Sequence, residues 1–246
     1  MIIQILSLFP EMFEGPFQSS ILKRAQEQKI IEFRLINFRD FTLDKHRMVD
    51  DIPYGGGSGM VLKPEPIYRS LQFAKETKPE PKVILLTPQG ELFKQHTARQ
   101  LATEEHLVMI CGHYEGFDER IRTFVDLELS IGDFVLTGGE LAAMVISDAI
   151  VRLLPGVLGS EESAVNDSFT ENLLDYPQYT RPVEFADLTV PEILLSGHHA
   201  KIEAWRKEQA LIRTAARRPD LLEGLNLSEQ EKQLLRQTLN LKLNQT

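Results

Sequence analysis

The sequence predicts an α/β protein, with a mostly parallel β-sheet covered by helices on both faces and a small all-helical domain at the C-terminal end. Three observations support this prediction. Runs rich in Val, Ile and Leu alternate with helical patterns up to about residue 154. Several of these runs end in Gly-containing loops, and from residue 199 the apolar residues follow helical spacing. The 246 residues, of which 42% are hydrophobic, suffice for a sizeable core.

The strands and helices of the first part are expected to alternate along the chain. The apolar runs predicted to form strands are residues 2–9, 31–38, 82–88, 106–112 and 134–136. The segments predicted to form helices are residues 17–29, 92–104, 117–123 and 139–154. Continuous apolar strands are typical of a sheet buried on both faces, so we expect parallel pairing. The helix at 139–154 is apolar on nearly every side, which indicates burial or an oligomer interface.

A polar, turn-rich stretch follows Pro155 and separates the two parts of the chain. The expected organisation is a first domain, a linker and a helical domain, at residues 1–160, 161–175 and 176–246. Within residues 199–216 the apolar side chains fall on one helical face. Ser228 and Glu231 have the spacing of a capping box, which predicts the start of another helix.

Composition gives no sign of a disulfide, a zinc site or a membrane span. The single cysteine, Cys111, lies in an apolar run and is expected to be a buried hydrophobic residue rather than a reactive thiol. The segment 1–13 is apolar but has no basic stretch or small-residue cleavage site, so we expect a strand and no signal peptide. No apolar run approaches about 20 residues. We therefore expect a cytoplasmic protein that does not bind a membrane.

The charges are unevenly distributed, although the net charge is −9. Residues 1–180 carry 17 Lys and Arg against 27 Asp and Glu, whereas residues 181–246 carry 10 against 9. We call the basic residues between 196 and 218 the basic stripe: Lys201, Arg206, Lys207, Arg213, Arg217 and Arg218. Such a stripe is typical of an RNA-binding surface, and also of an ordinary solvated helix face.

Three loops follow predicted strands, at residues 87–90, 111–116 and 130–140. In a parallel sheet, ligands bind where such loops meet at the carboxyl ends of the strands. The chain has no G-x-G-x-x-G and no P-loop motif, so neither a dinucleotide nor a triphosphate is indicated. An adenosine-containing cofactor of modest charge fits these loops, and three ordinary turns fit them as well. A further Gly-rich loop, at 54–60, is either flexible or suited to close approach of a substrate.

The motifs "YGGGSGM", "TPQG", "CGHYEGFDER", "SIGDFVLTGGELAAM", "PGVLG" and "DSF…DYPQYTRP" resemble those of the bacterial tRNA (guanine-N1)-methyltransferases of the knotted SPOUT superfamily. The resemblance runs in order from residue 1 to about 205 and continues more loosely in the helical remainder. It implies a deep C-terminal trefoil knot, which no residue pattern predicts because chains rarely thread their own loops. Ala142 and Phe134 depart from the Pro and Tyr expected in relatives, without removing a catalytic group.

The same resemblance implies the ligands and the assembly. The cofactor would be S-adenosylmethionine, and the substrate would be the anticodon stem-loop of tRNA, gripped by the C-terminal helices. A homodimer would place each active site between subunits. Magnesium would assist without a dedicated protein site, and we expect no metal-ligating residues.

Two residues are implied to be catalytic. Guanine N1 carries a proton, so its methylation needs a base for that proton and a cation for the charge that develops on O6. The family's proposed base corresponds to Asp167 of the D-S-F motif. Its proposed O6 partner corresponds to Arg152, since the planar guanidinium stays cationic. Without the resemblance, Asp167 is a linker residue and Arg152 an ordinary helix C-terminal cation.

The binding residues implied in this way fall into two sets. The cofactor set is Leu85, Leu86, Thr87, Pro88, Gln89, Gly112, Tyr114, Glu115, Gly116, Ser130, Ile131, Gly132, Asp133, Phe134, Val135, Leu136, Gly138 and Gly139. The substrate set is Gly55, Gly56, Gly57, Gly59, Asp175, Lys201, Arg206, Lys207, Arg217 and Arg218. Within the first set, the acidic Glu115 and Asp133 are either partners of the cofactor's ammonium group or surface charges.

The expected function is therefore methyl transfer from S-adenosylmethionine to N1 of guanosine at position 37 of tRNA, next to the anticodon. Two alternatives remain at this point. One is a knotted RNA methyltransferase that acts on ribose or another base. The other is a non-catalytic RNA-binding protein with an adenosine-type pocket.

Overall fold

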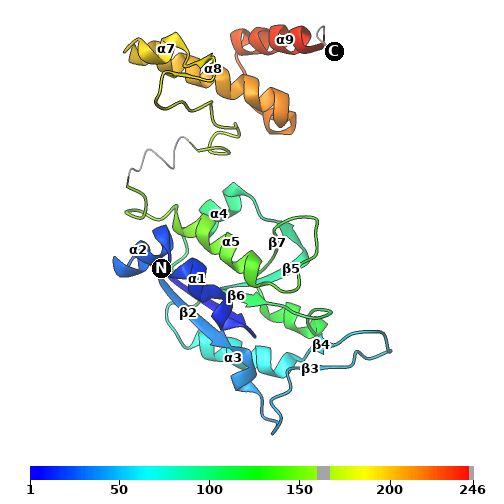
Figure 1. The fold of residues 1–246 in the computed structure, drawn as a ribbon. Coiled ribbons are helices and arrows are strands. Elements are labelled where there is room, and N and C mark those ends of the chain that lie inside the picture. The colour runs from blue at the N-terminus through cyan, green and yellow to red at the C-terminus, as the bar shows by residue number, and fades with distance from the viewer. Residues whose placement is uncertain (160–166, 244–246) are drawn as a thin grey trace. The chain divides into compact units, whose positions relative to one another are not determined.

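A computed structural model describes residues 1–159 and 167–243, together with the side chains up to residue 237. The chain divides into two compact units, Met1–Glu161 and Glu162–Thr246 (Figure 1).

The first unit is built on a five-stranded sheet with the strand order β2-β1-β6-β5-β7. Its strands are β1 (Ile2–Ser7), β2 (Glu32–Asn37), β5 (Lys82–Leu92), β6 (His106–Cys111) and β7 (Leu127–Ser130). Every pair of neighbouring strands is parallel. The predicted α/β class with a mostly parallel sheet is confirmed.

Helices cover both faces of this sheet (Figure 1). They are η1 (Pro10–Phe13), α1 (Glu14–Phe17), α2 (Ser20–Glu27), η2 (Phe38–Phe41), α3 (Pro64–Lys75), α4 (Gln95–Leu101), η3 (Glu119–Phe124) and α5 (Glu140–Val151). A small antiparallel pair, β3 (Asp50–Asp51) and β4 (Val61–Leu62), flanks the loop at 54–60.

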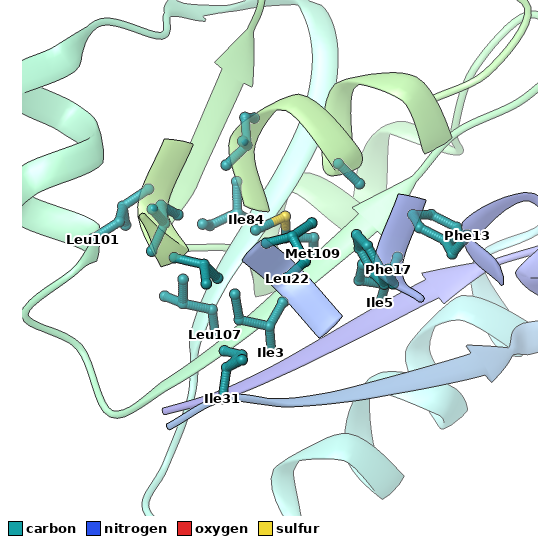
Figure 2. Close-up of a cluster of buried hydrophobic side chains, with 14 of the residues drawn as sticks. Ile3, Ile5, Phe13, Phe17, Leu22, Ile31, Ile84, Leu101, Leu107 and Met109 are labelled. Atoms are coloured by element: carbon teal, nitrogen blue, oxygen red, sulfur yellow. The ribbon is translucent and has the colours of Figure 1, made fainter. Parts of the chain in front are cut away.

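The side chains of each central strand alternate between two cores. Ile84 of β5 joins the cluster beneath α1, α2, α4 and α5 (Figure 2), whereas its neighbour Leu85 joins the cluster beneath α3. In β6, Met109 and Ile110 divide in the same way. Because both faces are buried, nearly every position of these strands is apolar, which is why the sequence shows continuous runs.

Several elements differ from their predictions. No element was predicted between residues 39 and 81, where β3, β4 and α3 lie, and the helix expected at 117–123 is the 3-10 helix η3. The strand expected at 134–136 is wrong, since Phe134 and Val135 are 53% and 86% exposed and the fifth strand is β7. β7 lies at the sheet edge, where the acidic Glu128 is tolerated, so it lacks the apolar run of a central strand. The helix expected from residue 92 begins only at Gln95, because β5 continues to Leu92.

The motif "TPQG" forms a bulge within β5 rather than a connection after it. Leu86 and Glu91 both pair with Leu129 of β7, so residues 87–90 are displaced from the ladder. At the end of the bulge, a Cβ on Gly90 would overlap the backbone of β7. Only glycine permits this approach of the two strands.

Cys111 lies at the end of β6 and is 1% exposed. Burial, and then the nearby charge of Glu140, raises the pKa of its thiol well above the usual range. The expected burial of this cysteine is confirmed, and the raised pKa agrees with the expectation of an unreactive thiol. In the part of the chain that the structure describes, no helix is long and apolar enough to cross a membrane. The trefoil knot stays a prediction from the resemblance.

The second unit is mainly helical. It contains α7 (Glu192–Leu195), α8 (His199–Arg217), η4 (Pro219–Leu222) and α9 (Glu229–Leu243), with a short hairpin of β8 (Glu184–Phe185) and β9 (Leu188–Thr189) that was not predicted. Leu211 and Ala215 of α8 pack with Leu235 of α9, and Leu173 packs against this cluster. The unit therefore has a core of its own.

The predicted capping box starts α9. The Ser228 hydroxyl accepts a hydrogen bond from the Glu231 N–H (3.3 Å), and the Glu231 carboxylate accepts one from the Ser228 N–H (2.8 Å). Lys207 Nζ of α8 lies 2.9 Å from the other carboxylate oxygen of Glu231. The lysine, followed by the Ser228 donors, lowers the pKa of Glu231 from 4.5 to about 2. One carboxylate thus caps α9 and joins it to α8.

Glu231→Gln should lower the free energy of unfolding by about 1 kcal/mol at pH 7, because it removes the charged cap and the contact with Lys207. The pKa of Glu231 is lower in the folded state, so its contribution is present above pH 4.5 and is lost as the pH falls toward about 2. Denaturant unfolding of the two proteins should therefore differ at pH 7 and converge near pH 2. Glu229→Gln, in the same helical turn but 82% exposed, should change little. A difference in the free energy of unfolding that does not change with pH would show that the charge of Glu231 is not the cause.

Candidate active site

A cavity of about 440 Å³ opens in the first unit among the loops that follow the strands of the sheet. The bulge of β5 forms one wall, the segment after β6 forms the second, and the connection from β7 to α5 forms the third. Such a volume is ordinary for a small-molecule site. The three loops singled out in the sequence therefore meet around one space.

The predicted cofactor residues line this cavity, except for Leu85 and Asp133. Leu85 is fully buried in the core beneath α3, because the strand alternation turns it to the other face. Seven further residues line the cavity and were not predicted: His113, Phe117, Glu119, Arg122, Leu129, Thr137 and Ala142. His113 and Phe117 lie within the motif "CGHYEGFDER", which was the sequence signal that could have identified them.

Arg122, from η3, is the one Lys or Arg among the described residues that line the cavity. Its guanidinium donates to Gln89 of the bulge (2.6 Å), to Glu119 (2.9 Å) and to Glu128 of β7. The Glu128 contact, followed by that of Glu119, raises the pKa of Arg122. Since two carboxylates already compensate its charge, the cavity offers little positive charge to a polyphosphate. This agrees with the absence of a P-loop motif.

The Gly-rich loop at 54–60 runs beside this cavity. The N–H of Glu115 donates to the carbonyl of Met60 (3.0 Å), and the N–H of Leu62 donates to the carbonyl of Gly116 (2.9 Å). A Cβ on Gly59 would overlap the Glu115 side chain. The predicted substrate residues Gly55, Gly56, Gly57 and Gly59 all have positive φ. Glycines thus allow the loop to fold against the rim of the cavity.

The two predicted catalytic residues belong to different units. Arg152 is the C-cap of α5 in the first unit, where its N–H donates to the carbonyl of Asp148 (3.1 Å). Asp167 belongs to the second unit, and neither residue lines the cavity described above. Asp167 instead lines a second cavity with Asp175, Arg206 and Lys207.

The segment that carries Asp167 is attached to α8. The N–H of Leu174 donates to Thr214 Oγ1 (2.8 Å), and Arg213 Nη1 donates to the carbonyl of Asp175 (3.2 Å). The N–H of Asp175 donates to the Ser168 hydroxyl (2.9 Å), which closes the turn. These contacts give Asp167 a defined place next to the basic helix.

The basic stripe on α8 is partly neutralised. Arg206 donates to Glu203 (2.5 Å) and lies over the Tyr176 ring at 4.9 Å. Lys207 pairs with Glu231, and Arg218 pairs with Asp220 (2.6 Å). Lys201 and Arg217 are exposed. Charge available to a polyanion thus comes from fewer side chains than the sequence count indicates.

Comparison with known proteins identifies the family. Residues 1–224 match the family model described as tRNA (Guanine-1)-methyltransferase TrmD. The chain belongs to the TrmD family. It is 59% identical over 235 residues to a tRNA (guanine-N(1)-)-methyltransferase of Halalkalibacterium halodurans, covering 95% of this chain and 96% of the relative. Proteins with the same description from Shouchella clausii and Bacillus cereus are 57% and 58% identical, with at least 96% of each chain covered.

The TrmD match includes the cavity in the first unit, the segment with Asp167 and the whole of α8. It ends before α9, which begins at Glu229. Among the residues described in this TrmD-family chain, no group of three or more His, Cys, Asp or Glu side chains could hold a metal ion.

Proposed function

We propose that this protein transfers a methyl group from S-adenosylmethionine to N1 of guanosine at position 37 of tRNA, next to the anticodon. The observation that carries the proposal is the convergence of the three predicted loops on one cavity, in a chain of the TrmD family. The cofactor supplies an electrophilic methyl group. The chain would bind and orient it, position the guanine, and accept the N1 proton.

The lining of the cavity suits an adenosine-containing ligand without a polyphosphate. Leu86, Ile131 and Leu136 offer apolar walls for a base, while Gly138 and Gly139 add no side chain to the wall. Arg122 is compensated by acidic neighbours, so the electrostatics favour a ligand of modest charge. The loop at 54–60, beside Glu115, is placed to approach a substrate that enters from the rim.

The chemistry of guanine N1 assigns the remaining roles. Asp167 would accept the N1 proton, and Arg152 would stabilise the charge that develops on O6. Asp167 lies in the unit that carries the basic stripe, and its segment is hydrogen-bonded to α8. Binding of the anticodon stem-loop by this unit would therefore carry the base along with the RNA. Reaction would then depend on correct docking, a form of induced fit.

A homodimer is part of the proposal. Leu141 and Val145 of α5 are 47% and 51% exposed, whereas the opposite side of the helix is buried in the core. Those apolar side chains are one turn apart and present a stripe suited to a second copy. A tRNA substrate also implies that the protein acts in the cytoplasm. Light scattering on the purified protein would test the assembly.

The deciding experiment identifies the product. Unmodified tRNA transcript with G37 is incubated with protein and S-adenosylmethionine, digested to nucleosides and analysed by mass spectrometry against standards. The proposal expects 1-methylguanosine, which disappears when G37 is replaced. A ribose or other base product would indicate another RNA methyltransferase, and cofactor binding without any product would indicate an RNA-binding protein.

Gly132→Val should weaken the binding of S-adenosylmethionine at least tenfold, because the new Cβ would overlap Phe134, which also lines the cavity. Gly132 also has φ +152°, a conformation that valine adopts poorly. Isothermal titration calorimetry measures the change. Gly15→Val, where the added Cβ meets open space, is the matched control. Unchanged affinity in Gly132→Val would remove this loop from the cofactor site.

Replacing Lys201 and Arg217 together by Ala should raise the KM for tRNA and flatten its dependence on salt, since phosphate contacts release counterions. Replacing Lys207 and Arg218 should have a smaller effect, because acidic neighbours already pair with them. Cofactor affinity should stay constant in both. The control, Lys23→Ala with Arg24→Ala on α2, removes the same charge from the first unit. If binding of tRNA is insensitive at every salt concentration, the stripe is a solvated surface.

Asp167→Asn should bind both substrates and yet methylate about 10²–10⁴-fold more slowly, since the amide cannot accept the proton. Arg152→Ala should also reduce turnover. The measurement is single-turnover methylation of bound tRNA across a range of pH. Asp175→Asn, altered in the same cavity as Asp167, provides the comparison. A wild-type rate and pH profile in Asp167→Asn would rule out Asp167 as the base. Asp175 would then be the next candidate for that role.

A further inference from the structure

A buried carboxylate lies behind the cavity and has no role in the mechanism above. Glu140, the first residue of α5, is 1% exposed. The Ser7 hydroxyl at the end of β1 donates to its Oε1 (2.6 Å), and Nε2 of His113 lies 3.4 Å from its Oε2. Three segments far apart in sequence thus meet at one carboxylate.

The neighbours of Glu140 are themselves held in place. The Ser7 hydroxyl accepts the N–H of Phe9 (2.9 Å), so its own proton is directed to the carboxylate. The Phe9 ring packs against the His113 ring, with centroids 4.7 Å apart. The imidazole therefore lies between an aromatic face and a carboxylate, which limits its rotation.

Burying a carboxylate is costly unless donors or a cation compensate it. The N-terminus of α5 offers a favourable dipole, and Ser7 offers one hydrogen bond. A hydrophobic residue of similar size would fill the same space without this cost. The cost of burying a carboxylate at this place points to a role beyond filling the core.

The cluster reaches the cavity through His113. This residue lines the cavity and forms an isolated antiparallel bridge with Gly138, which lines it as well. A Cβ on Gly138 would overlap both the Glu140 carboxylate and the His113 ring. The N–H of Gly139 donates to the carbonyl of Gly112 (2.9 Å), which joins the same two loops again. Two of the three cavity walls are thus joined directly above Glu140.

We propose that Glu140 is a positioning residue: through His113 it holds the loop at 111–116 against the start of α5, in the arrangement that binds the cofactor. The inference rests on the proposed function, because it concerns the same cavity. Glu140 does not line the cavity, so its effect is transmitted and not direct. It should act on the affinity for S-adenosylmethionine and not on the methyl-transfer step.

The test begins with Glu140→Gln, which keeps the shape and the acceptor for Ser7 and removes the charge. We expect the Kd and the KM for S-adenosylmethionine to rise about tenfold, the scale of one lost charge-assisted contact. The KM for tRNA, and kcat at saturating cofactor, should change less than twofold. Glu104→Gln, which removes a partly exposed glutamate paired with Lys82, is the control and should leave all values unchanged.

A double-mutant cycle with His113→Gln separates positioning from general destabilisation. Once His113 is replaced, Glu140→Gln should add little further loss of cofactor affinity. Additive losses, or wild-type affinity in Glu140→Gln, would overturn the inference and leave the proposed function intact. If Glu140→Gln does not fold, the affinity of His113→Gln for S-adenosylmethionine is the remaining test. Wild-type affinity in that variant would overturn the inference. A wild-type protein that binds no S-adenosylmethionine would overturn the inference and the proposed function together.

Discussion

The interrupted pairing of β5 with β7 is the constraint on which the candidate site depends. The two strands pair on both sides of residues 87–90 with a shift of register between Leu86 and Glu91, and the displaced residues form a wall of the cavity. Gly90 allows the backbones to meet again directly after the bulge. Because both ends of the bulge belong to the sheet, this wall is fixed by backbone hydrogen bonds and not by loop packing alone. The remaining walls are then joined to one another at Gly138 and His113.

The sequence predicts the strands that are buried on both faces, since burial imposes a continuous apolar run, as in "HLVMIC". It does not predict β7, whose edge position admits a charged residue, and it misplaces the bulge as a turn. Most cavity residues could be predicted, because they lie in motifs that resemble those of a family. Arg122 lies outside these motifs and Glu140 lies inside one, and neither was predicted, because their importance lies in contacts with residues distant in sequence, such as Gln89 and Ser7.

The two units divide the requirements of the proposed reaction. The first holds a cavity with little uncompensated positive charge, which suits a small cofactor, and the second holds the basic helix with Asp167 attached to it. A protein with a net negative charge can therefore bind RNA through one local basic surface, and the net charge does not predict that surface.

The state of Cys111 has a chemical consequence. This cysteine directly precedes Gly112, a residue of the cavity wall, and lies close enough to Glu140 for the carboxylate to raise the pKa of its thiol. Thiolates are strong nucleophiles, whereas thiols are weak ones. Burial and a neighbouring negative charge favour the protonated form of this sulfur. Under the proposed function, the chain's single cysteine would therefore compete poorly for the methyl group of a cofactor bound in the adjacent cavity.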